Sequence, residues 1–255
     1  EISCSLVGSE MCIRDRMDIA HIVELFCIER GRDMSPLWLS LWVASIALII
    51  VILSGLAACY WMNRCKWSGM AIIDALITLP LVLPPVVVGF ALLMVFTPGY
   101  AFGAWLETHG MSVVFAASGA VVASSVIAFP LFYQTVRSAL QSVDHNMEDV
   151  ARTLGASELR IFFTISVPLA WKGILTGSIL AFCRAMGEFG ATILIAGNIP
   201  KVTRTMPLAI YSYVEAGQYM DAFELVIYIC VLTLALLSGI HLITKGSLFR
   251  HIDNN

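Results

Sequence analysis

The sequence predicts an all-α integral membrane protein, and two observations lead to this fold class. The first is composition: 59% of the residues are hydrophobic, 13% are charged, and the mean hydropathy is +0.85, unlike soluble domains. The second is a set of apolar runs long enough to cross a hydrocarbon core of roughly 30 Å as helices. We place five spans at residues 37–61, 71–96, 112–135, 172–197 and 221–243. Continuous apolar runs favour helices over the alternating strands of a membrane barrel.

The residues before the first span differ from the rest of the chain. Residues 1–16 are too short and too polar to span, and they lack the basic-then-apolar order of a signal peptide. We interpret them as a non-native or read-through extension that precedes a natural start at Met17. Residues 17–36 hold a brief apolar-periodic patch and then a charged run, which predicts a short interfacial helix. Residues 37–245 then form the membrane domain, and residues 246–255 form a cytoplasmic tail.

The second span contains the sequence LPLVLPPVVVG. Pro80, Pro84 and Pro85 remove backbone donors within an apolar run, so the helix must bend or partly break there. Gly89 allows close approach of another helix. Two interpretations remain open: a kink that only aids packing, or a bent helix that lines a path that opens and closes. Pro130 in the third span invites the same two interpretations.

The fourth span places two charged residues in a mostly apolar run, CRAMGEFGATILIAGN. Arg184 and Glu188 lie four residues apart, on one helical face and within pairing reach. They form either a structural ion pair or part of a translocation path, in which Arg184 attracts a passing anion and Glu188 weakens that attraction. Gly187 and Gly190, around Glu188 and Phe189, suit tight helix packing or a narrow gate plugged by Phe189.

Lysine and arginine residues predict the orientation of the chain. One side of the membrane domain carries most of them: Arg64, Lys66, Arg137, Arg152, Arg160, Lys172, Lys245 and Arg250. The other side carries Lys201 and Arg204. Because cytoplasmic loops are enriched in Lys and Arg, we expect the C-terminus inside and the N-terminal segment outside, against which Arg30 and Arg32 stand as exceptions. Lys201 and Arg204 then mark either a docking surface for an extracytoplasmic partner or a simple turn with solvated charges.

The longest polar-rich stretch between spans is residues 144–168. Apolar residues recur there at helical spacing and polar residues occupy the other faces, so an amphipathic helix is predicted. Asp144 can cap its start and Gly155 can end it. A second short helix can restart at Ser157 and stop before Pro168. Taken alone, the stretch could be an ordinary cytoplasmic loop.

A spaced pattern favours a more specific function for this stretch. Asp149-Val150-Ala151 is followed by Gly155, and then by Ile165-Ser166-Val167-Pro168. This pattern resembles the EAA loop of permease subunits of binding-protein-dependent ABC importers, with Asp149 in place of the usual Glu. The resemblance implies a cytoplasmic coupling helix that docks in a groove on an ATPase subunit. The residues it assigns to coupling are Glu148, Asp149, Val150, Ala151, Leu154, Gly155, Ile165 and Pro168.

The run from Arg184 through Gly217 resembles molybdate ABC-transporter permeases, and LPLVLPPVVVG agrees with them, so the resemblance covers roughly 37–245. It implies the type I importer permease fold and translocation of molybdate or tungstate across the inner membrane of a prokaryote. Sulfate and thiosulfate permeases share much of this layout and remain the alternative. The implied partners are an ABC ATPase subunit and an extracytoplasmic oxyanion-binding protein. One small bundle with one coupling loop is half of a symmetric path, so we also expect a homodimer.

Two other classes of protein are alternatives to an importer subunit. An ion-coupled secondary transporter usually carries several intramembrane ionisable groups and repeated halves, whereas this sequence shows the Arg184–Glu188 pair, Asp74 at a span entrance and no clear repeat. An enzyme is disfavoured because the histidines are scattered and neither HExxH nor GxxxxGK[ST] occurs. We therefore expect no catalytic residue, metal or cofactor in this chain, no nucleic-acid partner, and ATP and Mg²⁺ used only by the partner ATPase subunit.

Overall fold

A computed structural model describes residues 36–64 and 69–252 of the chain. No strand occurs among these residues, and helices make up most of them, so the predicted all-α fold class is confirmed. The predicted extension at 1–16 and the interfacial segment up to Ser35 lie outside the described residues.

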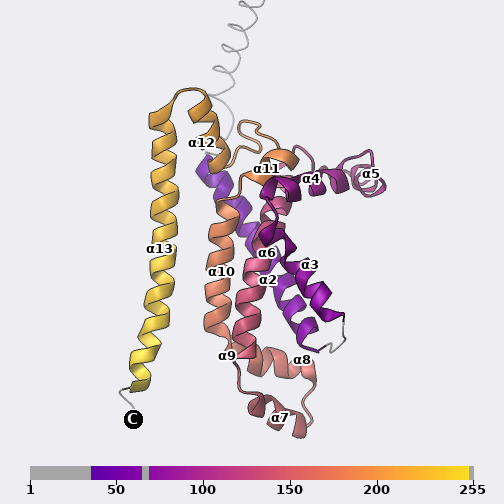
Figure 1. The fold of residues 1–255 in the computed structure, drawn as a ribbon, viewed down its shortest axis with the longest axis vertical. Helices are drawn as coiled ribbons and strands as arrows, with labels where there is room; N and C mark the ends of the chain where they lie inside the picture. Colours follow the sequence, from indigo (N-terminus) through magenta and orange to yellow (C-terminus); the bar gives the residue numbers. More distant parts are fainter. Residues whose placement is uncertain (1–35, 65–68, 253–255) are drawn as a thin grey trace, which may run out of the picture. The chain divides into compact units, whose positions relative to one another are not determined.

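The helices follow one another with short connections (Figure 1). In chain order they are α2 Pro36–Arg64, α3 Met70–Val82, α4 Pro85–Phe96, α5 Ala101–Thr108, α6 Ala117–Gln141, α7 His145–Thr153, α8 Glu158–Ile161, the π-helical turn η1 Phe162–Ser166, α9 Val167–Leu169, α10 Trp171–Met186, α11 Gly190–Ile195, α12 Met206–Glu215 and α13 Tyr219–Ile252. Helices α7 and α8 lie at one end of the helix bundle, and α4, α11 and α12 lie at the other (Figure 1).

Three of the described helices are long and apolar enough to cross a membrane alone, namely α2, α6 and the Tyr219–Ile240 part of α13. Two bent pairs pass the same test together: α3 with α4, bent by 112°, and Glu158–Leu169 with α10, bent by 77°. The described residues therefore provide three spans, or up to five if each bent pair is one span. The count of five stays a prediction.

The predicted boundaries of the third span are wrong by several residues at both ends. The backbone before α6 turns away from helical geometry, with Phe115 at φ 56° and its N–H donating to the carbonyl oxygen of Ile195 at 2.8 Å. At the other end α6 continues to Gln141, because Val136 and Leu140 still face the core and are buried. After residue 135 the sequence becomes less apolar, but the helix continues and still packs against its neighbours.

The predicted fourth span, 172–197, is not one helix. α10 ends at Met186, and α11 begins only at Gly190. The reason is local: the Glu188 carboxylate accepts a hydrogen bond from the Ala191 N–H at 2.8 Å, which satisfies a backbone donor in the first turn of α11. Glu188 therefore lies in a break between two helices rather than on a continuous helical face.

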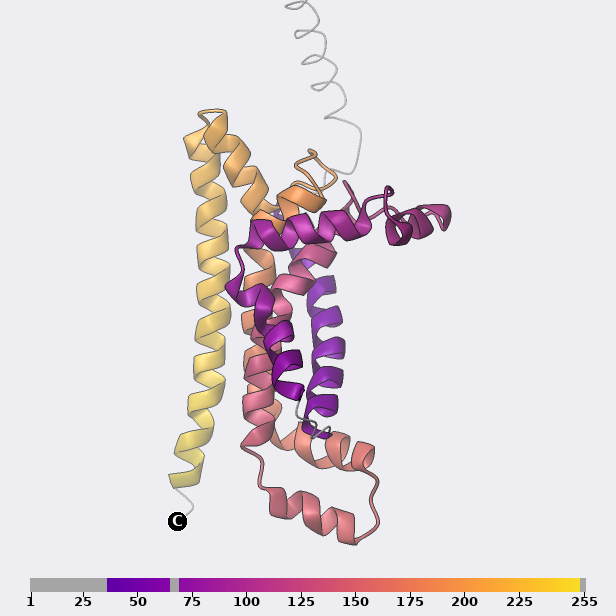
Figure 2. The ribbon, with the colours of Figure 1, turned by 45° about the vertical axis from the view of Figure 1, so that its right-hand side comes forward.

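The predicted bend in the second span is confirmed, and it is sharp. α3 ends at Val82 and α4 begins at Pro85, so Pro80 is tolerated within α3 and the break falls at Leu83–Pro84. Pro85 occupies the first turn of α4, where its missing N–H costs nothing. Figure 2 shows α4 running across the end of the bundle instead of along it.

The core of the bundle lies where α6 packs against α2 and α10. Phe132, Tyr133 and Val136 of α6 are completely buried. Small residues let the helices approach closely: a Cβ on Gly55 of α2 would lie 2.4 Å from the Phe132 ring, and one on Gly173 of α10 would lie 2.1 Å from the Ala139 Cβ. These contacts make α6 the central helix of the described part.

Two of the connections between the predicted spans contain short helices: α5 lies within residues 97–111 and α12 within residues 198–217. α13 begins at Tyr219 and runs to Ile252, past the predicted span end at 243 and into the predicted tail. The most apolar stretch of α13 has none of its residues buried, and both views show this helix standing beside the bundle (Figures 1 and 2).

Candidate functional site

The predicted amphipathic helix is α7, and the structure confirms how it begins and ends. Asp144 precedes the helix, and its carboxylate accepts a hydrogen bond from the Asn146 N–H at 2.9 Å, as an N-cap should. Gly155 follows the helix at φ +81°, a left-handed conformation that glycine adopts without steric cost. The apolar residues Met147, Val150 and Leu154 are 53%, 60% and 82% exposed. α7 therefore presents an unpartnered apolar face at one end of the molecule.

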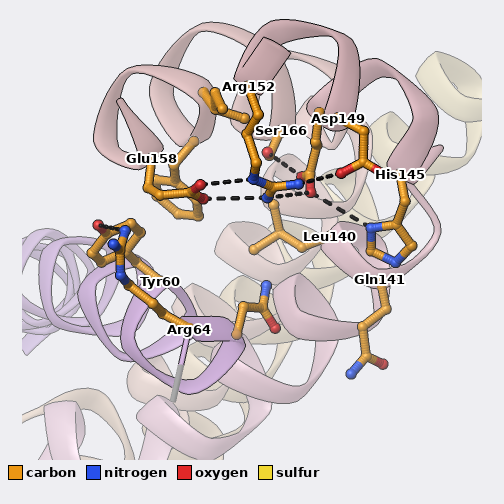
Figure 3. Close-up of a pocket in the computed structure, with 13 residues that line it drawn as sticks. Tyr60, Arg64, Leu140, Gln141, His145, Asp149, Arg152, Glu158 and Ser166 are labelled. Atoms are coloured by element: carbon orange, nitrogen blue, oxygen red, sulfur yellow. Dashed lines mark hydrogen bonds and ion pairs between the residues drawn. The ribbon is translucent and has the colours of Figure 1, made fainter. Parts of the chain in front are cut away.

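The opposite face of α7 is fixed to the next helical segment by four side chains, which we call the brace: Glu148, Arg152, Glu158 and Ser166. Ser166 is buried in η1, and its hydroxyl donates to Glu148 Oε1 at 2.6 Å. Arg152 donates to both carboxylate oxygens of Glu158, from Nε at 2.7 Å and from Nη2 at 3.2 Å (Figure 3). It also pairs with Asp149 on its own helix.

The brace forms one wall of a pocket of about 550 Å³. The other wall comes from the ends of α2 and α6, where Arg64 and Gln141 line the pocket (Figure 3). Within the brace, the hydrogen bond to Glu158 raises the pKa of Arg152 further above its usual range. Arg152 therefore stays charged and keeps its two-pronged contact with Glu158 across the Gly155 turn.

The prediction that the second short helix stops before Pro168 is wrong. The helical path runs from Glu158 through η1 and on to Leu169, with Pro168 in the first turn of α9. A proline ring normally clashes with the carbonyl four residues earlier, and here the wider π turn lies directly before it. The path bends at Ala170 instead. Of the three remaining coupling residues, Ala151 in α7 and Ile165 in η1 are half-buried, and Pro168 is exposed.

The second predicted site, around Arg184 and Glu188, does form an ion pair. Arg184 Nη1 donates to Glu188 Oε2 at 2.6 Å, and the Glu188 side chain is only 1% exposed whereas that of Arg184 is 30% exposed. Glu188 uses its other oxygen to hold the Ala191 N–H. The carboxylate thus has two fixed partners, while the guanidinium remains partly open to its surroundings.

The residues predicted as a gate come together around the same break. A Cβ on Gly190 would lie 3.1 Å from the Pro85 Cβ, so the end of the α3–α4 break touches the start of α11. Pro84 is exposed at this break, and Gly187 is exposed at the end of α10. Phe189 is half-buried, and its ring centroid lies 5.3 Å from that of Tyr211 in α12. Phe189 therefore packs on a neighbouring helix.

The two outer cations differ in their surroundings. Lys201 is exposed in the turn before α12, with φ +66°. Arg204 is half-buried, and its Nε donates to Asn198 Oδ1 at 2.9 Å. They lie three residues apart in the chain, at the end of the bundle that carries α11 and α12 (Figure 1).

Sequence reasoning missed Ser166 and Glu158 as partners of α7, and it left Asp74 without a partner. Asp74 in α3 accepts hydrogen bonds from Tyr133 and Arg137 in α6. No spacing rule points to contacts between such distant positions, but a charged residue in an apolar run was a usable signal for Asp74, since such a group needs a partner.

Comparison with known proteins gives consistent results. A family described as the inner membrane component of binding-protein-dependent transport systems matches residues 50–245. Two proteins named molybdenum transport system permease protein ModB are similar: that of Escherichia coli K12 is 42% identical over 78% of this chain and 86% of its own length, and that of Haemophilus influenzae is 39% identical over 79% and 89%.

Among solved structures, an inward-facing MetNI methionine ABC transporter aligns with a TM-score of 0.62 at 15% identity, over 82% of this chain and 93% of its own. A bacterial importer of the acidic polysaccharide alginate aligns with a TM-score of 0.68 at 14% identity, over 89% and 83%. At these identities the likeness concerns the fold alone, and it confirms the predicted fold of an ABC importer permease.

Proposed function

Because the chain belongs to the family of inner membrane components of binding-protein-dependent transport systems, we propose that it is the permease subunit through which molybdate enters the cell. The names of relatives about 40% identical over most of their length support molybdate over the sulfate and thiosulfate alternative. Membership of this family also disfavours an ion-coupled secondary transporter. Tungstate has nearly the same size and charge as molybdate, so it belongs to the same substrate class.

The observation that carries the proposal is the exposed apolar face of α7. Met147, Val150 and Leu154 stand at the end of the bundle with more than half of each side chain exposed, although contiguous apolar surface is normally covered. An ATPase subunit that closes on ATP and Mg²⁺ is the partner that fits this face. Its movement then reaches the membrane helices through the brace. In this proposal that end is cytoplasmic, the C-terminus lies inside and the N-terminal segment lies outside, which agrees with the orientation predicted from the Lys and Arg residues.

The anion path passes Arg184 in this proposal. The guanidinium is partly open, and Glu188 already occupies one of its donors, so an oxyanion meets a cation whose charge is partly compensated. Such a site attracts an anion and still releases it. Gly187 and Gly190 flank Glu188 at the α10–α11 break, and Gly190 lies against Pro85 at the α3–α4 break, so both breaks are next to the ion pair. A second copy of the chain completes the path as a homodimer, and an oxyanion-binding protein docks at the end that carries Lys201 and Arg204.

The first experiment is co-purification of this chain from membranes with a co-expressed ABC ATPase, followed by ATP hydrolysis assays. Binding protein loaded with molybdate, tungstate or sulfate is added in parallel. Stimulation by molybdate or tungstate, but not by sulfate, is the expected outcome. No complex with the ATPase would overturn the coupling function of α7, and stimulation by sulfate alone would overturn the substrate.

Variants at the coupling helix separate its function from its folding. Leu154→Asp puts a charge on the apolar face, and because Leu154 is 82% exposed the change leaves the core intact. It should abolish co-purification with the ATPase, whereas Leu154→Met, which keeps the apolar character, should not. Gly155→Pro cannot adopt the φ of +81° at this turn, so it should uncouple transport from ATP hydrolysis while the protein remains in the membrane. Normal transport by Gly155→Pro would refute the coupling function.

Arg184→Ala tests the path. The variant should transport molybdate poorly in proteoliposomes, while its ATPase subunits still assemble on α7. Undiminished transport would show that the Arg184–Glu188 pair serves only the structure.

A further inference from the structure

α3 is attached to the bundle by an unusually thin apolar contact. None of its residues is buried, and Ile72, Leu76 and Val82 are 67%, 61% and 82% exposed. Only a narrow face with Met70, Ile73 and Ile77 packs, partly buried, against the hydrophobic core, where α6 is the main neighbour of α3. The apolar contact of α3 with the bundle is therefore narrow, and between helices in a membrane such a contact is not strengthened by the removal of apolar surface from water.

A polar cluster lies in the middle of that face. Asp74 is on the same side of α3 as Met70 and Ile77, at helical spacing. Its Oδ1 accepts a hydrogen bond from the Tyr133 hydroxyl at 2.8 Å and another from Arg137 Nη1. Tyr133 and Arg137 are one turn apart on α6, and the guanidinium carbon lies 5.7 Å from the centroid of the Tyr133 ring. Hydrogen bonds to charged groups are the strong ones, so this cluster fixes where α3 sits on α6.

The cluster is built so that it can open. Tyr133 is completely buried, but the side chains of Asp74 and Arg137 are 35% and 28% exposed. Asp74 lies four residues after the start of α3 and Arg137 four residues before the end of α6, so the pair is near the end of both helices, where water can replace the contact. Opening a fully buried pair would instead leave bare charges at a high cost. The Glu188 side chain is only 1% exposed, so water cannot take the place of Arg184 as its partner in the same way.

The neighbouring segments define how α3 would move. Beyond the break at Leu83–Pro84, α4 is fixed to α11, since a Cβ on Gly89 would lie 2.6 Å from the Ala191 Cα. α4 therefore stays with α11 when α3 shifts, and the break is the pivot. We propose that Asp74, Tyr133 and Arg137 form a releasable latch that sets the position of α3 against α6. Asp74 is the positioning residue of this latch. The latch is a property of this chain alone and does not rest on its substrate.

The test measures the distance between α3 and the bundle directly. Spin labels carried by noncanonical amino acids at Leu76 in α3 and Ile49 in α2, both exposed, report this distance by pulsed electron paramagnetic resonance in lipid nanodiscs. Asp74→Ala removes the acceptor of both hydrogen bonds, so the population with a displaced α3 should rise by roughly tenfold or more. Tyr133→Phe removes one bond and should give a smaller rise. Asp74→Glu, which keeps the carboxylate, should restore the narrow distribution.

A matched control removes the same kind of contact elsewhere. In α13 the Tyr228 hydroxyl donates to Glu224 Oε1 at 2.8 Å, and Glu224→Ala should leave the α3 distance unchanged. Labels at Ile49 and Ser138, on α2 and α6, report whether the bundle itself remains folded in each variant. Identical α3 distances in the wild type and in Asp74→Ala, with the bundle intact, would overturn the latch and assign the position of α3 to its apolar face. Because no transport is measured, this result is independent of the proposed substrate.

Discussion

The contact between α4 and α11 gives a sharp prediction for Gly89→Ala. A Cβ at residue 89 would lie 2.6 Å from the Cα of Ala191 and 2.9 Å from its carbonyl oxygen, whereas ordinary van der Waals contact begins at 3.4 Å. The helices must therefore separate by about 0.8 Å at this point, the difference between 3.4 and 2.6 Å. The obstructing atoms belong to the backbone, so no side-chain rotation relieves the clash.

The free-energy cost follows from a matched pair of variants. Overpacking of this kind costs about 1–3 kcal/mol, while alanine within a helix gains about 1 kcal/mol over glycine. Gly239→Ala in α13 gains the same propensity, but its Cβ meets nothing within 4 Å. The difference in the free energy of unfolding between the two variants, about 1–3 kcal/mol, therefore isolates the clash. At about 2–4 °C per kcal/mol for a chain of this size, Gly89→Ala should unfold roughly 2–12 °C below Gly239→Ala.

Thermal unfolding of both purified variants in the same detergent, followed by tryptophan fluorescence, measures this difference. Equal Tm values for Gly89→Ala and Gly239→Ala would refute the close approach of α4 to α11. They would also remove the fixed pivot on which the movement of α3 depends.

Three further predictions concern the brace, the buried carboxylate and the turn after α7. Arg152→Lys cannot make the two-pronged contact with Glu158, so limited proteolysis should cut between α7 and α8 faster than in the wild type; an unchanged rate would mean that the brace does not order this turn. Glu188→Gln keeps an oxygen for the Ala191 N–H but loses the charged bond to Arg184, so the free energy of unfolding should fall by about 1.5–3 kcal/mol. Glu188→Ala loses both contacts and should lower it further. Equal free energies of unfolding for the two variants would contradict the capping function. Gly155→Ala and Gly217→Ala place a Cβ in open space at φ of +81° and +73°, so each should cost about 1–2 kcal/mol in thermal unfolding. Only Gly155→Ala should weaken co-purification with the ATPase, and equal weakening by both would place the effect in overall stability.

The sequence predicted those features that depend on neighbours along the chain. Asp144 and Gly155 marked the ends of α7 because capping is chemistry of adjacent residues, and Pro84 and Pro85 marked the break because proline lacks a backbone donor. The spacing of Arg184 and Glu188 predicted their ion pair correctly, but for an incomplete reason. Spacing of four assumes a continuous helix, whereas Glu188 reaches Arg184 from the break after α10 while it caps α11.

The features that the sequence did not predict depend on contacts between distant segments. The hydroxyl of Ser166 reaches Glu148 across 18 residues, and the hydroxyl of Tyr133 reaches Asp74 across 59. Neither serine nor tyrosine is unusual in a membrane protein, so composition gave no signal for either contact. Hydropathy likewise placed the fourth span across Gly187, because it averages over a window and cannot detect a break in which a buried carboxylate caps the second of two helices.

The described contacts connect α7 to α4 without a gap, and α4 continues into α3 across the Leu83–Pro84 break. Some of these contacts are buried and rigid, whereas the contact of α3 with α6 can open. The brace ties α7 to η1, and the path then bends at Ala170 into α10, which carries Arg184. Arg184 holds Glu188, Glu188 holds the start of α11, and α11 holds α4 through Gly89. Contiguity alone does not establish coupling; a two-state element is needed. The proposed latch on α3, in which the Asp74 and Arg137 side chains are partly exposed, would be such an element, whereas the buried Glu188 contacts are not. If an ATPase subunit moves α7 as proposed, we expect α10, α11 and α4 to move together and the strain on the latch to change, so that α3 yields there.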